Sequence, residues 1–234
     1  MGLTWSFFNP ILMLVIYTFV FSVVFKARWS AESTSKTEFA IVLFAGLIIH
    51  GLFAECVNRA PALILSNVNY VKKIVFPLEI LPWVSLASAL FHAGVSLAVL
   101  LIFFLLIHLS LNWTIIFLPV LIMPLALLIM GVSWFLASIG VFIRDVGQMI
   151  GIVTTILLFL SPVFYPVSAL PENLRPLLHL NPLTFIIEQV RLVLIWGKVP
   201  NWIGLVIYLA CSMLVVSTGF FWFQKTRKGF ADVL

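Results

Sequence analysis

The chain has 234 residues, of which 63% are hydrophobic and 9% are charged, whereas an ordinary soluble domain has about 25% charged residues. This composition excludes a soluble globular protein and indicates an integral membrane protein. The net charge is +5, but the basic residues are scattered, so no nucleic-acid-binding patch is predicted. Cys56 and Cys211 lie in or beside apolar stretches and predict neither a disulfide framework nor a metal site.

Long uncharged stretches predict the membrane spans. Asp, Glu, Lys and Arg are missing from residues 1–25, 39–54, 80–143, 146–171 and 199–224. A helix needs about 20 mainly apolar residues to cross a bilayer, so the third stretch holds two spans, divided at the polar residues around Asn112. We therefore expect an all-α integral membrane protein with six transmembrane helices, over Trp5 to Phe25, Phe39 to Val57, Trp83 to Leu109, Trp113 to Phe142, Val146 to Tyr165 and Trp202 to Phe223.

The charges in the loops bear on orientation. An even number of spans places both termini on one side, and the basic tail with Lys225, Arg227 and Lys228 favours the cytoplasm. Lys and Arg are nearly evenly divided between the two sides, however, so the charge distribution alone leaves the orientation open.

Two loop segments are more than simple connections. Residues 58–82 are amphipathic, with Lys72 and Lys73 followed by breaks at Pro77 and Pro82, a pattern typical of an interfacial helix or of a helix that docks a partner protein. A loop helix that merely rests on lipid is the alternative.

The second segment, residues 166–201, predicts two short helices that dip back into the outer face of the membrane. Its apolar part, Leu183 to Trp196, is too short to cross. Non-helical backbone at that depth is tolerated only against protein or water, which indicates the mouth of a cavity. Glu188 and Arg191 lie three residues apart, so they can share one helical face and compensate each other.

Other residues leave alternatives open. Met13, Tyr17, Phe21 and Phe25 recur every fourth residue and predict one aromatic helix face, which could stack on sugar rings or pack against lipid and other helices.

Arg144 and Asp145 form a charged turn between the fourth and fifth spans. Nucleotide-binding and hydrolase motifs such as GxxxxGK[ST], HExxH and GxSxG do not occur, so transport would need an ion gradient or a separate ATPase.

Three strings resemble one known family. They are LTWSFFNPILMLVIYTFVFSVVF, NVNYVKKIVFPLEILP and FIRDVGQMIGIVTTILLFLSPVFYPVSALPENLRPLLHLNPLTFIIEQVR. In this order they closely resemble the permease subunit of ABC-2-type polysaccharide exporters, which carry O-antigen, capsule or teichoic-acid chains across the bacterial inner membrane. The resemblance covers nearly the whole chain and implies a single ABC-2-type transmembrane domain over residues 1–234.

The resemblance also implies partners and sites. It predicts a homodimer around one channel, two cytoplasmic ABC ATPase subunits that hold ATP and Mg, both termini in the cytoplasm, and no catalytic residue, metal or cofactor in this chain. Its substrate is a lipid-linked polysaccharide, with O-antigen expected first. The residues that match the family's sites are, for ATPase coupling, Asn69, Tyr70, Lys72, Lys73, Phe76, Pro77, Arg144 and Asp145; for the glycan channel, Tyr17, Phe21 and Phe25; and for the outer gate, Asn181, Glu188 and Arg191.

The chain departs from the family pattern at its start. Family members carry a basic amphipathic helix before the residues that match Gly2 to Trp5, so we expect that helix to be missing here.

Two other functions are alternatives to polysaccharide export. One is a small-lipid or drug exporter on the same scaffold, and the other is a membrane-embedded glycan or acyl transferase that uses Glu188, Arg191 or the histidines.

Overall fold

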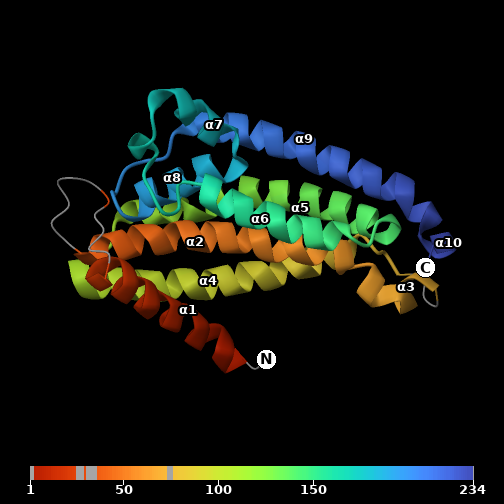
Figure 1. Ribbon diagram of the computed structural model, residues 1–234, viewed down its shortest axis with the longest axis horizontal. Helices are drawn as coiled ribbons and strands as arrows, with labels where there is room; N and C mark the ends of the chain where they lie inside the picture. The colour runs from red at the N-terminus through yellow and green to blue at the C-terminus, as the bar shows by residue number, and fades with distance from the viewer. Residues whose placement is uncertain (1–2, 25–28, 30–35, 73–75, 234) are drawn as a thin grey trace. The chain divides into compact units, whose positions relative to one another are not determined.

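The structure, a computed structural model, describes residues 3–24, 29, 36–72 and 76–233, and within these residues every regular element is a helix (Figure 1). The elements are α1 (Leu3–Tyr17), η1 (Thr18–Val24), α2 (Lys36–Arg59), η2 (Ala60–Ala62), η3 (Leu65–Asn67), α3 (Val68–Lys72), α4 (Ile80–His108), η4 (Trp113–Phe117), α5 (Leu118–Phe142), α6 (Val146–Leu160), η5 (Val167–Ala169), η6 (Glu172–Leu174), α7 (Arg175–Leu180), α8 (Pro182–Leu194), α9 (Trp202–Thr226), η7 (Arg227–Gly229) and α10 (Phe230–Val233). The predicted all-α class is confirmed.

Five helical stretches in the described part of the chain are long and apolar enough to cross a membrane. They are Thr4–Phe21, Thr37–Ala62, Ile80–His108, Trp113–Phe142 and Trp202–Gly229, and each coincides with a span predicted from the uncharged stretches. The remaining predicted span corresponds to α6, which has 15 residues. At a rise of 1.5 Å per residue, α6 alone covers about 22 Å, less than the ~30 Å hydrocarbon core.

The first helix changes its geometry at Thr18. Residues Thr18–Val24 form a π-helix, and at the junction the Thr18 hydroxyl donates to the Leu14 carbonyl at 2.7 Å. A π-helix bonds residue i to i+5 and therefore has more residues per turn than an α-helix. The predicted four-residue face of α1 consequently does not continue unchanged beyond Tyr17.

The chain forms two compact units. The first comprises Met1–Gly51, Phe91–Pro119 and Leu158–Pro200 and therefore contains α1, α7 and α8. Its core is aliphatic: α2 contributes Ile41 and Leu43, α4 contributes Leu100, and α8 contributes Leu183 and Ile186, all fully buried.

The second unit comprises Leu52–Leu90, Val120–Leu157 and Asn201–Leu234, and in it α5 and α9 approach each other through glycine. A Cβ at Gly219 would overlap the carbonyl of Gly131, and a Cβ at Gly131 would overlap that of Val215. Small residues at helix crossings allow such backbone contact in membrane proteins. Gly147 and Gly151 have GxxxG spacing but make no comparable approach, since the space around Gly151 is open.

Candidate functional site

The segment between α6 and α9 bends sharply at Asn181. The helical stretches Glu172–Leu180 and Pro182–Leu194 meet at 98°. The Asn181 side chain is buried; its Oδ1 accepts from the backbone N–H of Leu183 at 2.9 Å, and its Nδ2 donates to the Ser161 hydroxyl at 2.8 Å. Asn at the N-cap followed by Pro at the first helical position favours the start of a helix, so Asn181 and Pro182 fix the beginning of α8.

The other end of α8 is held by the turn before α5. The last carbonyls of a helix have no intrahelical donor. Here the Thr114 hydroxyl donates to the Val193 carbonyl at 2.5 Å, and the Asn112 Nδ2 donates to the carbonyls of Leu194 and Ile195, each at 3.1 Å. Both ends of α8 are therefore anchored by side chains from other parts of the first unit.

Arg191 is the most deeply buried charged side chain of the described residues, with 1% of its surface exposed. Its Nε donates to the Val42 carbonyl at 2.9 Å, its Nη1 to the Pro162 carbonyl and its Nη2 to the Val163 carbonyl at 3.0 Å. The guanidinium also lies 4.5 Å from the centre of the Trp29 ring, a cation–π contact. Arg191 thus joins α8 to α2 and to the turn after α6.

The three predicted outer-gate residues accordingly differ in their surroundings. Asn181 and Arg191 are buried and direct their polar groups to the protein's own backbone and to Ser161, whereas Glu188 is half-buried. Their role at a gate stays a prediction, and what the contacts establish is that Asn181 begins α8 at the bend and that Arg191 anchors α8 to α2.

The predicted ATPase-contacting residues lie in what we call the coupling segment, residues 67–82. Its helix α3 carries Asn69 and Tyr70, and both side chains are exposed. The Tyr70 ring stacks on Phe76, with centroids 4.8 Å apart, and Pro77 after it is exposed. The side chain of Lys72 and the whole of Lys73 lie outside the described residues. Tyr70 and Pro77 are therefore available to a partner protein.

The remaining coupling candidates, Arg144 and Asp145, form the turn between α5 and α6, and both side chains are exposed. The Asp145 carbonyl accepts from the backbone N–H groups of Gln148 at 3.0 Å and Met149 at 3.3 Å, so Asp145 begins α6. This exposure leaves both charges free to meet solvent or a partner.

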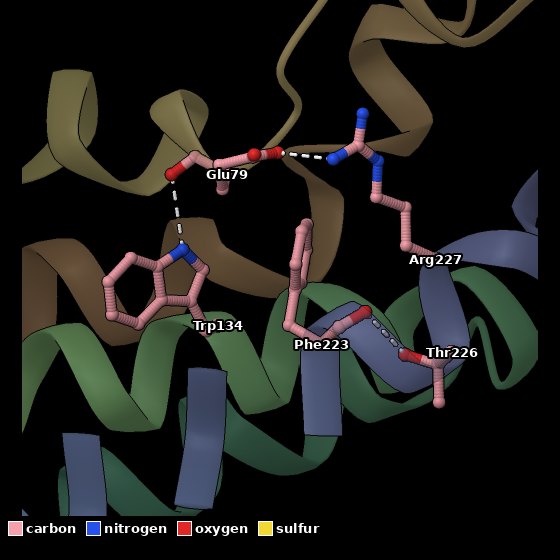
Figure 2. A network of polar contacts seen from close by, with 5 residues as sticks. All are labelled: Glu79, Trp134, Phe223, Thr226 and Arg227. Carbon is pink, nitrogen blue, oxygen red and sulfur yellow. Dashed lines mark hydrogen bonds and ion pairs between the residues drawn. The ribbon is translucent and has the colours of Figure 1, made fainter. Parts of the chain in front are cut away.

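Glu79 connects the coupling segment to two other helices and was not singled out from the sequence (Figure 2). Its Oε2 lies 2.8 Å from the Arg227 Nη1 at the end of α9, and its backbone carbonyl accepts from the Trp134 indole N–H of α5 at 3.1 Å. The only sequence signal was that Glu79 is the single acidic residue of the string FPLEILP. Its partners are too distant in sequence for spacing to reveal.

The predicted aromatic face contributes to a ring cluster in the first unit. Phe21 is half-buried and stacks on Phe39 of α2 at 5.3 Å and on Phe164 at 6.3 Å. Tyr17, also half-buried, has its ring 6.5 Å from that of Phe21, while Phe25 lies outside the described residues. The contacts with Phe39 and Phe164 show that Phe21 packs against other parts of the first unit. The part of its surface that stays exposed is the part on which a ligand would stack.

An apolar groove runs between α1 and α4 within the first unit. Its volume is about 520 Å³, and it is lined by Ile11, Leu14, Val15, Thr18, Phe19, Val99, Ile102, Phe103 and Leu106. The one polar side chain, Thr18, already donates its hydroxyl to Leu14. Ligand pockets commonly have volumes of 300–1,000 Å³, and this lining suits a hydrocarbon chain and offers nothing to orient a polar group.

A metal centre is not formed by the described residues, because no three His, Cys, Asp or Glu side chains come together in a way that could hold an ion. Among the polar contacts of the described residues are those that anchor α8 in the first unit and those of Glu79 in the second.

Comparison with known proteins adds a family and three relatives. Residues 1–195 match the family described as ABC-2 type transporter. The O-antigen export system permease protein RfbA of Myxococcus xanthus is 24% identical over 99% of this chain and 87% of that protein. Two proteins of the same name from Klebsiella pneumoniae are each 23% identical over 100% of this chain and over 88% and 87% of their own lengths.

Proposed function

The chain belongs to the ABC-2 type transporter family, and we propose that it is the transmembrane permease subunit of an ATP-driven exporter for lipid-linked O-antigen polysaccharide. The observation that carries the proposal is the similarity to proteins named O-antigen export permeases, which extends over 99% or more of this chain. Capsule or teichoic-acid chains are the alternative cargo, since they are also glycans on a lipid anchor and would use the same path.

We propose six crossings of the bacterial inner membrane with both termini in the cytoplasm. Five crossings are the long apolar helices. The fifth in chain order would combine α6 with residues 161–165, and the α7–α8 pair with its 98° bend would return to the outer face as re-entrant helices. The burial of Asn181 and Arg191 supports a bent pair that is packed against protein, as irregular backbone at membrane depth requires.

The energy would come from two ABC ATPase subunits, which hold ATP and Mg and dock on a homodimer of this chain. The exposed side chains of Tyr70, Pro77, Arg144 and Asp145, together with Lys72 and Lys73 of the coupling segment, would form the contact. ATP-driven closure of the ATPase pair would displace this segment and open the channel. The permease itself would contribute no catalytic residue.

The channel wall is expected to include Tyr17 and Phe21. Alanine at both positions should lower export several-fold, because a sugar ring loses the aromatic surface on which it stacks, while the amount of protein in the membrane stays near wild type. Surface polysaccharide measured by immunoblot checks this, with Phe8→Ala, an exposed position on the same helix, as the control. Unchanged export in the double variant would assign both rings to packing alone.

The groove between α1 and α4 is the proposed seat of the hydrocarbon anchor of the cargo. Its apolar lining matches an alkyl or prenyl chain, because burying such a chain stabilises the complex in proportion to its apolar area. A lipid-linked glycan carrying a photoreactive diazirine in its chain should label Ile102 and Leu106 several-fold more than Val206 and Ile207, exposed residues of α9. Equal labelling of the two helices would remove the groove from the pathway.

The whole proposal is tested in a strain that lacks the gene. Wild type should restore polysaccharide to the cell surface, whereas a variant with Lys72 and Lys73 changed to Glu and Tyr70 changed to Ala should reach the membrane and fail to restore it. Lys198→Glu, placed by the proposed topology on the outer face, is the matched charge control. The glycan should accumulate inside cells that carry the coupling variant.

The rivals predict different results. Normal surface polysaccharide in the deletion strain, with no glycan accumulating inside, would exclude export of a polysaccharide and favour a small-lipid or drug exporter. Loss of a modified glycan that is still exported would favour a membrane-embedded transferase, and substitution of Glu188 would then abolish the modification.

A further inference from the structure

Glu79 is held by two bonds that lead to two different helices (Figure 2). Its carboxylate pairs with Arg227 at 2.8 Å, and its backbone carbonyl accepts the indole N–H of Trp134 at 3.1 Å. The ion pair is sheltered, with 26% of the Glu79 and 34% of the Arg227 side chain exposed. Solvent screens such a pair less than an exposed one, and it belongs to a network rather than standing alone.

The residues around Glu79 are stiff. Pro77 and Pro82 lie on either side of it in the string FPLEILP, and each proline ring fixes its own φ. Between them the Ile80 N–H donates to the Pro77 carbonyl at 3.0 Å, and the Leu81 N–H donates to the Leu78 carbonyl at 3.2 Å. Backbone rotation within residues 77–82 therefore absorbs little of a displacement applied at one end, and most of the displacement reaches the other end.

The end of α9 is equally well fixed to its surroundings. Thr226 donates its hydroxyl to the Phe223 carbonyl at 3.1 Å, and Phe223 is fully buried against the ring of Phe230, whose centroid lies 5.6 Å away. Phe230 begins α10 and also contacts Phe142 of α5. Because α10 packs against α3, the C-terminal residues touch the coupling segment at a second point.

We propose that the Glu79–Arg227 pair is a latch that ties the C-terminal residues 227–233 to the coupling segment, so that a displacement of Glu79 moves α9 through Arg227 and α5 through Trp134. Glu79 and Arg227 are positioning residues in this scheme, since they act on the spans and touch neither ATP nor cargo. The latch rests on the proposed function for the source of the displacement, and it assigns to the C-terminal residues a part in coupling that the ATPase-contact residues alone do not include.

The test compares two substitutions that change the same charge one residue apart. Arg227→Glu places two carboxylates together at the latch, whereas Lys228→Glu, at an exposed neighbouring position, leaves Glu79 paired. The complex with the ATPase is purified for each variant, and polysaccharide exported per ATP hydrolysed is measured in proteoliposomes. Arg227→Glu should retain the ATPase and its hydrolysis rate within twofold of wild type and lose at least tenfold in export per ATP, while Lys228→Glu stays near wild type.

The double variant Glu79→Arg with Arg227→Glu restores opposite charges and should recover at least half of the wild-type ratio. Equal ratios for Arg227→Glu and Lys228→Glu, or a double variant no better than Arg227→Glu, would overturn the latch. If the Arg227→Glu protein is lost from the membrane, the double variant decides the outcome. Its recovery of export per ATP supports the latch, and its failure to recover overturns it.

A second readout separates the latch from the proposed function. Amide hydrogen exchange of the purified wild-type chain should show residues 68–72 protected, and the protection should fall several-fold in Arg227→Glu and return in the double variant, whatever cargo the exporter carries. If the wild-type complex exports no polysaccharide but the variants show the expected differences in hydrogen exchange, the proposed function is contradicted and the latch is still supported. Exchange that is the same in all variants would overturn the latch.

Discussion

Replacing Arg191 by methionine is expected to destabilise the protein by about 3–5 kcal/mol, a magnitude typical of removing one partner from a buried charged network. The buried guanidinium donates to the carbonyls of Val42, Pro162 and Val163, and a net contribution of about 1.5–3 kcal/mol is usual for a hydrogen bond to a charged group. Methionine fills a similar length but donates nothing, so three carbonyls lose the guanidinium donor in a buried site.

The effect should be visible as a lower midpoint of thermal unfolding in detergent and as less protein in the membrane. Arg175→Met is the matched control, because Arg175 lies in the same segment and its side chain is 39% exposed and 3.8 Å from Glu172. Its bonds to the carbonyls of Leu170 at 3.2 Å and Ser168 at 3.4 Å lie nearer to the surface than those of Arg191, so the substitution should change the stability by less than about 1 kcal/mol. Arg191→Lys keeps the charge without the planar fork and should recover only part of the loss. Equal midpoints for Arg191→Met and Arg175→Met would contradict the anchoring role.

Valine at Gly219 is expected to cost about 3 kcal/mol or more, because side chains forced into a packed contact displace the backbone around them. Even the first carbon of a side chain at Gly219 would overlap the Gly131 carbonyl on α5, and backbone on both sides of the contact belongs to helices that cannot bend away independently. The helices α5 and α9 would have to separate along this contact.

Gly94→Ala is the control for this prediction. Gly94 lies in α4, and no atom outside its own helix comes within 4 Å of a Cβ built there, so alanine should raise the stability by up to about 1 kcal/mol through its higher helix propensity. Chemical unfolding followed by tryptophan fluorescence in detergent micelles measures both variants. A Gly219→Val protein as stable as wild type would mean that α5 and α9 do not meet through Gly131.

Much of the fold could be predicted because the bilayer imposes one simple rule. Uncharged stretches of sufficient length become helices, and five of the six predicted spans coincide with helices long enough to cross. The exception is α6, which ends at Leu160, whereas the prediction continued to Tyr165. The string SPVFYP after it contains two prolines, and proline lacks the N–H that an α-helix needs, so the α-helix ends before the predicted end of the span.

The aromatic face illustrates a different limit. Its prediction assumed one helical period from Met13 to Phe25, but the backbone changes to a π-helix at Thr18, where a hydroxyl bonds the Leu14 carbonyl. Threonine makes such local bonds in many ordinary helices, so the sequence carries no clear signal for the change. Phe21 stacks on Phe39 of α2, a contact that residue spacing along the first helix does not reveal.

Site residues were predictable where the signal is local and unpredictable where it depends on distant partners. Asn181 and Pro182 form a recognisable helix start, and the two short helices around them were expected. Arg191 was singled out as half of a pair with Glu188, yet its hydrogen bonds go to backbone carbonyls as distant in sequence as Val42. Glu79 and Arg227 are separated by 148 residues, and no spacing rule relates residues so far apart.

Transport in a purified system tests the central claim most directly. The chain and its ATPase subunit, reconstituted in proteoliposomes with the ATPase facing outward, are given a fluorescent lipid-linked O-antigen, and the fraction protected from a membrane-impermeant quencher is followed. The account predicts that ATP and Mg raise the protected fraction several-fold, and that an ATPase variant unable to hydrolyse ATP does not. A protected fraction unchanged by ATP, from folded and assembled complex, would contradict the assignment of this chain as a polysaccharide-exporting permease.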